Sequence, residues 1–501
     1  MIVYCLLSTA KANNLTITNI SAPTTQTIQF DIAWDNSWYA SAPTNNWDGI
    51  WVFVKTQVCG GGSNPWSHAN VSTLSGDHSV AGGVLQVDAV TDGKGVFIRR
   101  SALGSGSIAS STVVLKLGTP VVAVASTNYE VIGIEMVNVP QGSFTIGDGS
   151  TSNTLHSTAS YGTGNTSTPY TIANENAIAQ DAIRNDKAAD AAITAHPNII
   201  AGFPKGYNSF YCMKYEISQQ QYSTFLNLLE YNQQLSRTAA SPSGAIGTAA
   251  LCATSGDNRN SIEIAVPGIA FSTPAVYGND LNGNNVFDET SDGGTVACNY
   301  LSWDDLKAYL DWSGLRPMTE LEFEKASRGS NTSIQSEYVW GSTIINQAIS
   351  SSILNAGQVS EVSTSSADGL CAANGGASAI LGPIRTGFAA TATSTRTNAA
   401  SSFYGIMDLG GNVWEQAFQT GFWNGSARAP IPTFGGALGD GALDLSGNSN
   451  ATNWGAVSYS VVRGGSWENV NQRVQTSDRY YVNSTAENTT RVRRTGGRGV
   501  R

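Results

Sequence analysis

A run of oxygen-bearing side chains in the middle of the chain has the spacing of a calcium-binding loop. A hard cation such as Ca²⁺ takes about six to eight oxygen ligands, and side chains spaced in this way can curl around one point. Position 12 of the loop is Ser291 and not the bidentate Glu of an EF-hand, so a polar turn without metal is the alternative. The predicted ligands at loop positions 1, 3, 5 and 9 are Asp280, Asn282, Asn284 and Asp288.

Other carboxylates could suggest the acid/base pair of a glycosidase, but their positions indicate helix starts. Ser218, Ser302 and Thr319 are each followed three residues later by Gln, Asp or Glu, which is the pattern of a capping box. We therefore predict helices that begin at these three residues, with Asp305 and Glu322 as capping partners. Glycosidase chemistry is correspondingly disfavoured.

Three phrases stand in order in the C-terminal part of the chain. They are Gly314-Leu-Arg-Pro-Met-Thr-Glu-Leu-Glu-Phe-Glu-Lys, Gly405-Ile-Met-Asp-Leu-Gly-Gly-Asn-Val-Trp-Glu and Val462-Arg-Gly-Gly-Ser-Trp. Together they resemble the formylglycine-generating enzyme (sulfatase-modifying factor) family, a variant of the C-type lectin fold. Where the copper-binding oxidases of that family have two cysteines, this chain has Asn469 and Val474. The resemblance thus implies the family scaffold without the thiols that hold copper(I), and predicts no copper.

The resemblance also implies calcium sites. In the family, an asparagine, a glutamate and the backbone carbonyls between them hold an ion, and the matching residues here are Asn412, Val413 and Glu415. A second family site maps onto Asn355 and Asp368. The alternative for the first turn is that its polar side chains bond to neighbouring backbone while its tryptophan packs inward.

Eight arginines follow Val462 in a chain that is otherwise acidic. The resemblance places the family's ligand cleft in this segment, and guanidinium groups there could hold carboxylate or sulfate groups bidentately. Structural pairing with acidic residues is the alternative. The candidate ligand-binding residues are Ser466, Asn469, Arg479 and Tyr480.

The composition indicates an extracellular protein that does not bind nucleic acid. A net charge of −10 opposes binding to phosphate backbones, which needs a basic surface. Residues 1–12 combine an apolar run with Ala10-Lys11-Ala12 and predict a signal peptide, with a buried first strand as the alternative. No later apolar run approaches the ~20 residues that span a bilayer. We therefore predict a secreted or cell-surface protein without a transmembrane segment.

The predicted fold class is α+β in two parts. Residues 13–128 alternate in the manner of strands and predict a β-sandwich. Its tryptophans fit core packing, or alternatively a carbohydrate-stacking surface. Residues 129–501 form the formylglycine-generating-enzyme-like domain, with long loop insertions at about 150–206, 232–296 and 344–401. The Ala-rich stretch 174–195 favours a helix.

Cysteines and histidines give no pattern of a redox or metal centre. Cys252 and Cys298 flank the second insertion and could pair in an oxidising compartment, but the sequence leaves their pairing open. The chain contains no Cys-x-x-Cys motif, and its four histidines lack the spacing of metal ligands.

These observations favour a secreted, non-catalytic protein that uses the family scaffold for assembly of a surface layer or filament, or for ligand binding. The expected partners are further copies of the chain, an extracellular protein or a glycan, with Ca²⁺ as the bound ion. Formylglycine-forming oxidation is one alternative. A retroelement-diversified binding protein is another, because such proteins use the same fold and end much as this chain does.

Overall fold

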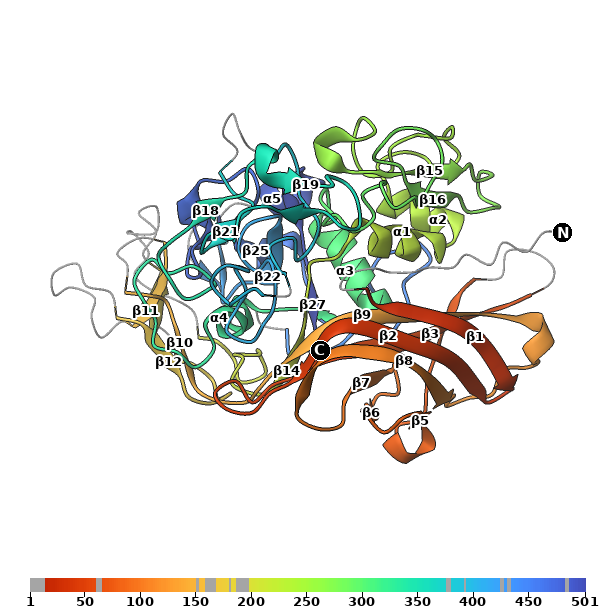
Figure 1. The fold of residues 1–501 in the computed structure, drawn as a ribbon, viewed down its shortest axis with the longest axis horizontal. Coiled ribbons are helices and arrows are strands. Elements are labelled where there is room, and N and C mark those ends of the chain that lie inside the picture. The colour runs from red at the N-terminus through yellow and green to blue at the C-terminus, as the bar shows by residue number, and fades with distance from the viewer. Residues whose placement is uncertain are drawn as a thin grey trace.

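The structure is a computed structural model of the chain in which the α+β class is confirmed. The molecule combines a β-sandwich with a larger part rich in loops and short helices (Figure 1). The residues that it describes are 14–59, 65–149, 153–157, 168–179, 182–185, 198–374, 380–391, 393–423, 428–429, 434–482 and 486–501.

The outer sheet of the sandwich is antiparallel and is built from N-terminal strands alone. Along its second strand, alternate residues Ile28, Phe30, Ile32 and Trp34 are buried toward the sandwich interior, as the period of a strand requires. The strands, in their order across the sheet, are β1 (Thr16–Thr24), β2 (Thr27–Tyr39), β8 (Gly104–Lys116) and β5 (Ser79–Val80).

The inner sheet has eight strands and joins the two parts of the chain. Strand β3 pairs with β9 from Asp48 opposite Val137 to Val58 opposite Thr127, so strand pairing crosses the predicted boundary at residue 128. The order across the sheet is β17 (Arg316–Pro317), β27 (Gly499–Val500), β14 (Phe210–Met213), β9 (Thr127–Val139), β3 (Asp48–Val58), β7 (Val96–Arg100) and β6 (Leu85–Ala89), while β4 (Ser67–Ala69) also pairs with β3.

Strand β3 is buried on both faces, which is why its sequence is apolar almost throughout. Ile50, Val52 and Val54 belong to the sandwich core, whereas Trp51 and Phe53 belong to the core of the larger part. The Trp51 indole nitrogen also donates to the Ser313 carbonyl at 2.8 Å. The two parts of the chain therefore share one sheet, whose two faces belong to different cores. Trp51 packs in a core, as the core-packing interpretation of the tryptophans predicts.

The three predicted helix starts are confirmed. Ser218, Ser302 and Thr319 are N-caps, and each helix shows both hydrogen bonds of a capping box. The helices of the chain are α1 (Gln219–Asn227), α2 (Tyr231–Arg237), α3 (Trp303–Trp312), α4 (Glu320–Arg328) and α5 (Ala486–Thr489).

The helix predicted in the first insertion is wrong where the structure describes it. Residues 183–185 form β13 (Ile183–Asn185), which pairs antiparallel with β11 (Leu155–Ser157). Ile183 is buried in the main core, so pairing and burial override the helix propensity of the alanines. Residues 180–181 and 186–197 lie outside the described residues.

The second insertion and the described residues of the third are joined by buried polar contacts. The fully buried Glu361 carboxylate of the third insertion pairs with Arg259 of the second and accepts a hydrogen bond from the Arg385 amide at 2.8 Å. The strands outside the two main sheets are short: β10 (Phe144–Ile146), β12 (Tyr170–Ile172), β15 (Ile262–Val266), β16 (Val276–Asn279), β18 (Asn346–Gln347), β19 (Ile353–Leu354), β20 (Val362–Ser363), β21 (Leu370–Cys371), β22 (Trp414–Phe418), β23 (Phe422–Trp423), β24 (Arg428–Ala429), β25 (Ser460–Arg463) and β26 (Thr495–Gly496).

The cysteines that the structure describes are free thiols. Cys252 and Cys298, whose pairing the sequence leaves open, are both buried and not bonded to each other. Over the described ranges, no helix has both the length and the apolar character needed to cross a membrane.

Because the two parts share one sheet, we expect them to unfold together. Trp51→Ala should lower the free energy of unfolding by about 3–5 kcal/mol because it leaves a cavity between the two cores. Urea unfolding followed by circular dichroism and by tryptophan fluorescence should give one transition that shifts as a whole. Leu103→Ala, at a side chain that is 64% exposed, is the control with little expected effect. Two separate transitions, of which only one shifts, would contradict a shared core.

Candidate functional site

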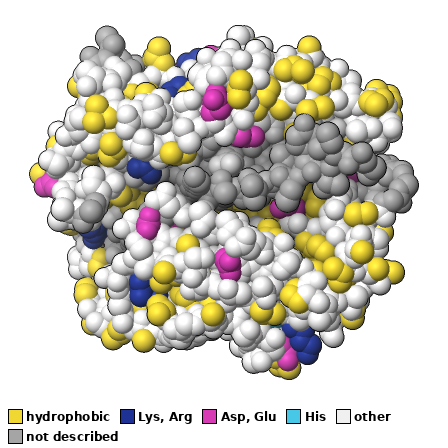
Figure 2. Space-filling model, turned by 45° about the vertical axis from the view of Figure 1, so that its right-hand side comes forward, with side chains coloured by type: hydrophobic (Ala, Val, Ile, Leu, Met, Phe, Trp, Pro, Cys, Tyr) yellow, Lys and Arg dark blue, Asp and Glu magenta, His cyan; other side chains and the backbone are white. Residues whose placement is uncertain are grey.

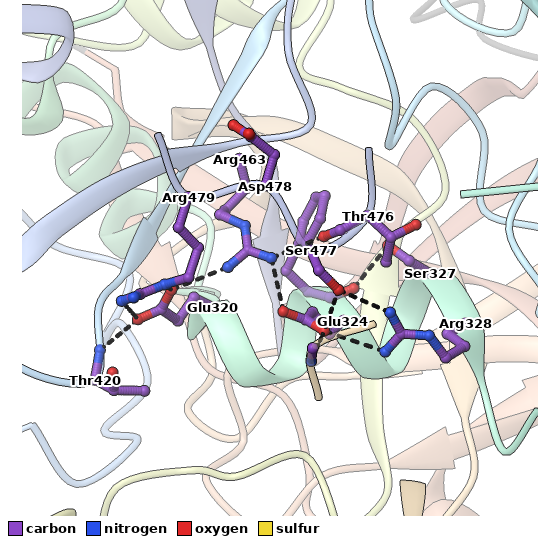
Figure 3. A network of polar contacts seen from close by, with 12 residues as sticks. Glu320, Glu324, Ser327, Arg328, Thr420, Arg463, Thr476, Ser477, Asp478 and Arg479 are labelled. Atoms are coloured by element: carbon purple, nitrogen blue, oxygen red, sulfur yellow. Dashed lines mark hydrogen bonds and ion pairs between the residues drawn. The ribbon is translucent and has the colours of Figure 1, made fainter. Parts of the chain in front are cut away.

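Helix α4 carries two carboxylates that lie in the core between arginines (Figure 3). Arg463 on β25 donates to Glu320 at 3.0 Å and to Glu324 at 2.9 Å, and so bridges one turn of the helix. Arg479 pairs with Glu320, and Arg328 pairs with Glu324 at 3.1 Å. All five side chains are at most 2% exposed. We call these five residues the α4 ladder.

The electrostatics of the α4 ladder are those of a structural network. Burial alone would raise the pKa of Glu320, but the charges and hydrogen bonds of Arg479 and Arg463 outweigh it and lower the pKa to about 2. Glu322 faces a separate partner, Arg316, at 2.6 Å. Each α4 carboxylate is therefore paired with arginine and enclosed, which suits a role in stability and not acid/base chemistry.

The arginines of the C-terminal segment pair with acidic residues, which is the alternative to ligand binding that the sequence leaves open. All eight form ion pairs with acidic residues. The pairs are Arg463 with Glu320 and Glu324, Arg473 with Asp478, Arg479 with Glu320, Arg491 with Asp305, Arg493 with Glu468, Arg494 with Glu487, Arg498 with Glu415, and Arg501 with Asp92. Arg479, which the sequence places on a ligand-binding face, lies in the core instead. Some of the partners are near in sequence, such as Asp478 for Arg473, whereas the partner of Arg479 is 159 positions away.

The other predicted ligand-binding residues divide into buried and exposed ones. The Ser466 hydroxyl is buried and donates to the Asn469 side chain at 2.5 Å. Tyr480 is 39% exposed, and the Arg473 guanidinium lies 3.6 Å from its ring centre. Of the predicted face, the half-buried Asn469 and the exposed Tyr480 therefore remain accessible, and Tyr480 is stacked with the half-buried Arg473.

The turn predicted to bind calcium is held by protein groups. The Asn412 amide donates to Glu216 at 2.6 Å and accepts from the Ile384 amide at 2.9 Å. Glu415 pairs with Arg498 at 2.6 Å, and Trp414 packs inward. The polar groups of the turn are thus bonded to residues distant in sequence and not to neighbouring backbone, while the inward packing of Trp414 agrees with the alternative. The buried acid Glu216 is a partner that the sequence reasoning missed.

A surplus of buried negative charge nevertheless surrounds this turn. Glu216, Asp408 and Glu415 are buried near Arg498, and Asp408 also lies near Arg385, so three acids face two guanidinium groups. Burial raises the pKa of Glu415 to about 7 although Arg498 opposes the shift, and one of its carboxylate oxygens, Oε2, has no hydrogen-bond partner among the described residues. The charge and the free oxygen fit a divalent cation held by Glu415 and backbone carbonyls. Asp408 stands in the second family phrase and could have been proposed from the sequence.

The loop at Asp280 closes on itself as its spacing predicts. The Asp280 carboxylate accepts hydrogen bonds from three backbone amides, among them Asn285 at 2.7 Å. The Asn282 and Asn284 oxygens accept from backbone amides, whereas Asp288 turns to Asn279. Burial and repulsion from Asp280 and the other loop acids raise the pKa of Asp292 to about 6.

The remaining predicted site residues are not brought together by any described contact. The Asn355 side chain donates to the Ser360 carbonyl, and the Asp368 carbonyl accepts from Asn346. Across the part of the chain that the structure describes, no three His, Cys, Asp or Glu side chains converge as ligands of a metal ion. Calcium binding therefore stays a prediction.

Comparisons with known proteins point to one family. Residues 124–501 match the family model described as the sulfatase-modifying factor enzyme 1-like domain. No curated protein matches the chain. Among solved structures, the group B streptococcus pilus 2b backbone protein is similar over 40% of this chain and 83% of that chain, with 12% identity and a TM-score of 0.10, which is too low to support an argument.

The α4 ladder predicts a specific acid sensitivity. Because the pKa of Glu320 is lowered from 4.5 to about 2, its contribution to stability is present above pH 4.5 and is lost as the pH falls toward 2. That shift corresponds to about 3 kcal/mol. Glu320→Gln should remove this pH dependence and cost about 3–5 kcal/mol at pH 7, since it leaves two arginines underpaired. Equilibrium unfolding at pH 3 to 7 measures both effects.

Asp304→Asn provides the control for the α4 ladder. Its carboxylate lies at a helix start as well, but the side chain is 66% exposed and pairs only at the surface with Lys307. The variant should stay within about 1 kcal/mol of the wild type. An equal loss in both variants would contradict the special role of buried pairing.

Calcium should stabilise the protein if the acidic turns bind it. Ligand binding to the native state adds about 2.7 kcal/mol at a hundredfold excess over Kd. Glu415→Gln and Asp280→Asn should each reduce the calcium-dependent rise in Tm, measured for every variant against its own value in EGTA. Asp304→Asn should keep the full rise. An identical Tm with calcium and with EGTA in the wild type would exclude both sites.

Proposed function

Because the chain belongs to the sulfatase-modifying factor family, we propose that it uses the family scaffold to bind a ligand outside the cell and carries out no cysteine oxidation. The surroundings of the two positions at which the oxidases carry thiols support this proposal. Asn469 is tied to Ser466, and Val474 is fully buried in the core cluster of Val339 and Trp340. Copper(I) needs soft sulfur ligands, which neither residue offers.

The cysteine nearest to this region does not replace the missing thiols. Cys371 donates to the Gly410 carbonyl at 3.1 Å, and burial raises its thiol pKa well above the usual range. Only a thiolate is an effective metal ligand or nucleophile, so a protonated, enclosed thiol is a structural residue. Cys212 and Cys298 are likewise fully buried, and burial raises both thiol pKa values.

An extracellular location is part of the proposal. Residues 1–12, which the sequence indicates as a signal peptide, lie outside the described residues. The support comes from the sequence pattern and from the surface, where charged side chains are sparse among uncharged polar and apolar ones (Figure 2). Such a surface is uncommon for a chain that must bind polyanions.

Self-association is the second candidate function, and one strand edge favours it. Strand β8 is bordered by β5 only at Val113 and Val114, so within the described part of the chain Gly104–Ser110 has no neighbour on that side. The stretch is uncharged and almost fully exposed. An uncharged free edge can pair with another strand.

The proposal predicts that the purified protein forms no formylglycine in a cysteine-containing sulfatase peptide. Mass spectrometry of the peptide after incubation with copper(I) and oxygen should show the unmodified cysteine. The double variant Asn469→Cys, Val474→Cys should gain copper(I) binding in a chelator competition, because it restores two soft ligands. Copper-dependent conversion of the peptide by the wild type would overturn the proposal, whereas sedimentation of the wild type as oligomers would favour self-association.

A further inference from the structure

The second insertion and the C-terminal segment enclose a groove of about 760 Å³. We call it the insertion groove. Its walls come from residues 239–257 of the insertion, from Tyr300 and Ser302 at the start of α3, and from residues 489–491. The insertion supplies most of this lining, so the groove is a feature that this chain adds to the scaffold. Its size suits a ligand of a few sugar rings or a short peptide.

One end of the insertion groove has more cationic than anionic groups. Arg491, which lines the groove, lies 2.8 Å from the Asp305 carboxylate, and the buried Arg237 lies 3.2 Å from the same oxygen. Two guanidinium groups thus share one carboxylate. Arg491 also donates to the Ser236 and Thr238 carbonyls at 3.0 and 3.2 Å, and its side chain remains 21% exposed. Asp305 compensates only one of the two positive charges, and an oxyanion is the acceptor that arginine recognises best.

The remaining lining is rich in hydroxyl groups. Thr248 and Thr490 line the groove and bring their hydroxyl groups to it. Asp257 is exposed there and accepts a hydrogen bond from the Tyr300 hydroxyl at 2.8 Å. The apolar lining consists mainly of alanines, which leave room without offering a deep hydrophobic pocket. Carboxylates and hydroxyls that face a shallow groove suit a polyhydroxylated ligand better than an apolar peptide.

The backbone at this groove is strained. Tyr300, Asn258 and Arg259 have φ values of 60°, 47° and 61°, in the left-handed region that residues with a Cβ rarely adopt. The Asn258 amide holds the turn by donating to the Tyr300 hydroxyl at 2.8 Å. Strain of this kind costs about 1–3 kcal/mol per residue and concentrates at functional sites. Here it fixes Asp257 at the rim of the groove.

We propose that the insertion groove binds an acidic saccharide, with a carboxylate or sulfate group at Arg491 and sugar hydroxyls at Asp257, Thr248 and Thr490. The inference rests on the proposed binding function and names its ligand class. It differs from the face predicted around Asn469 and Tyr480. The shared chemistry is an oxyanion on a polyhydroxylated ring, and the test below separates uronates from sulfated sugars.

The test measures binding by the full-length protein with isothermal titration calorimetry. The probes are a glucuronate-containing disaccharide, a monosulfated disaccharide without carboxylate, and lactose as the neutral control. At least one acidic probe should bind tenfold or more tightly than lactose, and its affinity should fall as salt rises. If neither acidic probe binds, or if lactose binds equally well, the proposal is overturned. Binding of an Asp/Glu-rich peptide in place of the saccharides would also overturn it.

Three variants locate the binding. Arg491→Gln should weaken the binding of the acidic probe at least tenfold. Ala253→Trp should abolish this binding, because the larger side chain fills the groove from its exposed rim without contacting an ion pair. Arg493→Gln is the matched control, because Arg493 is in the same segment but pairs with Glu468 and does not line the groove. Unchanged affinity in Ala253→Trp, with an unchanged Tm, would exclude the groove. Failure here leaves the peptide-oxidation test of the proposed function unaffected.

Discussion

The structure depends on the pairing of buried arginines with buried carboxylates around α4. A lone ionised group in the core would cost several kcal/mol, so Glu320 and Glu324 can be enclosed only because Arg463, Arg479 and Arg328 are enclosed with them. These arginines come from the helix itself and from segments more than a hundred residues later. The α4 ladder therefore joins the C-terminal strands to the helix, and it draws in arginines that would otherwise lie at the surface. Arg491, on which the proposed saccharide binding depends, lies outside the ladder.

How much the sequence reveals follows from the range of each interaction. The three capping boxes involve residues three positions apart, and all three helix starts could be predicted from them. The partner of Arg479 is 159 positions away, so local spacing suggested an exposed binding residue although the side chain is buried. The alanine-rich stretch failed in the same way, because β13 is stabilised by its pairing with β11 and not by local propensity.

The candidate sites also divide into features set by near neighbours, which the sequence reveals, and features set by distant contacts, which it does not reveal. The loop at Asp280 closes through bonds between near neighbours, so its curled shape could be read from residue spacing. The turn at Asn412 could be located by resemblance, but its partner Glu216 lies nearly two hundred positions earlier. The insertion groove had no signal in the sequence. It arises where an insertion, a helix start and a tail segment meet, and no motif marks such a meeting.

The distribution of these features suggests how the scaffold can change its chemistry. The larger part supplies the α4 ladder and the acidic turn, which are buried, while the shared sheet takes strands from both parts. Asn469 and Val474, at the positions where the resemblance places the thiols of the oxidases, fit this core, because one side chain bonds to its neighbour Ser466 and the other fills apolar space. The insertions contribute residues to the main core, such as Ile183 and Ile264, and the second and third insertions are joined through Glu361. A groove lined largely by such an insertion can bind a ligand without disturbing the charge pairing within, so one scaffold can host different functions.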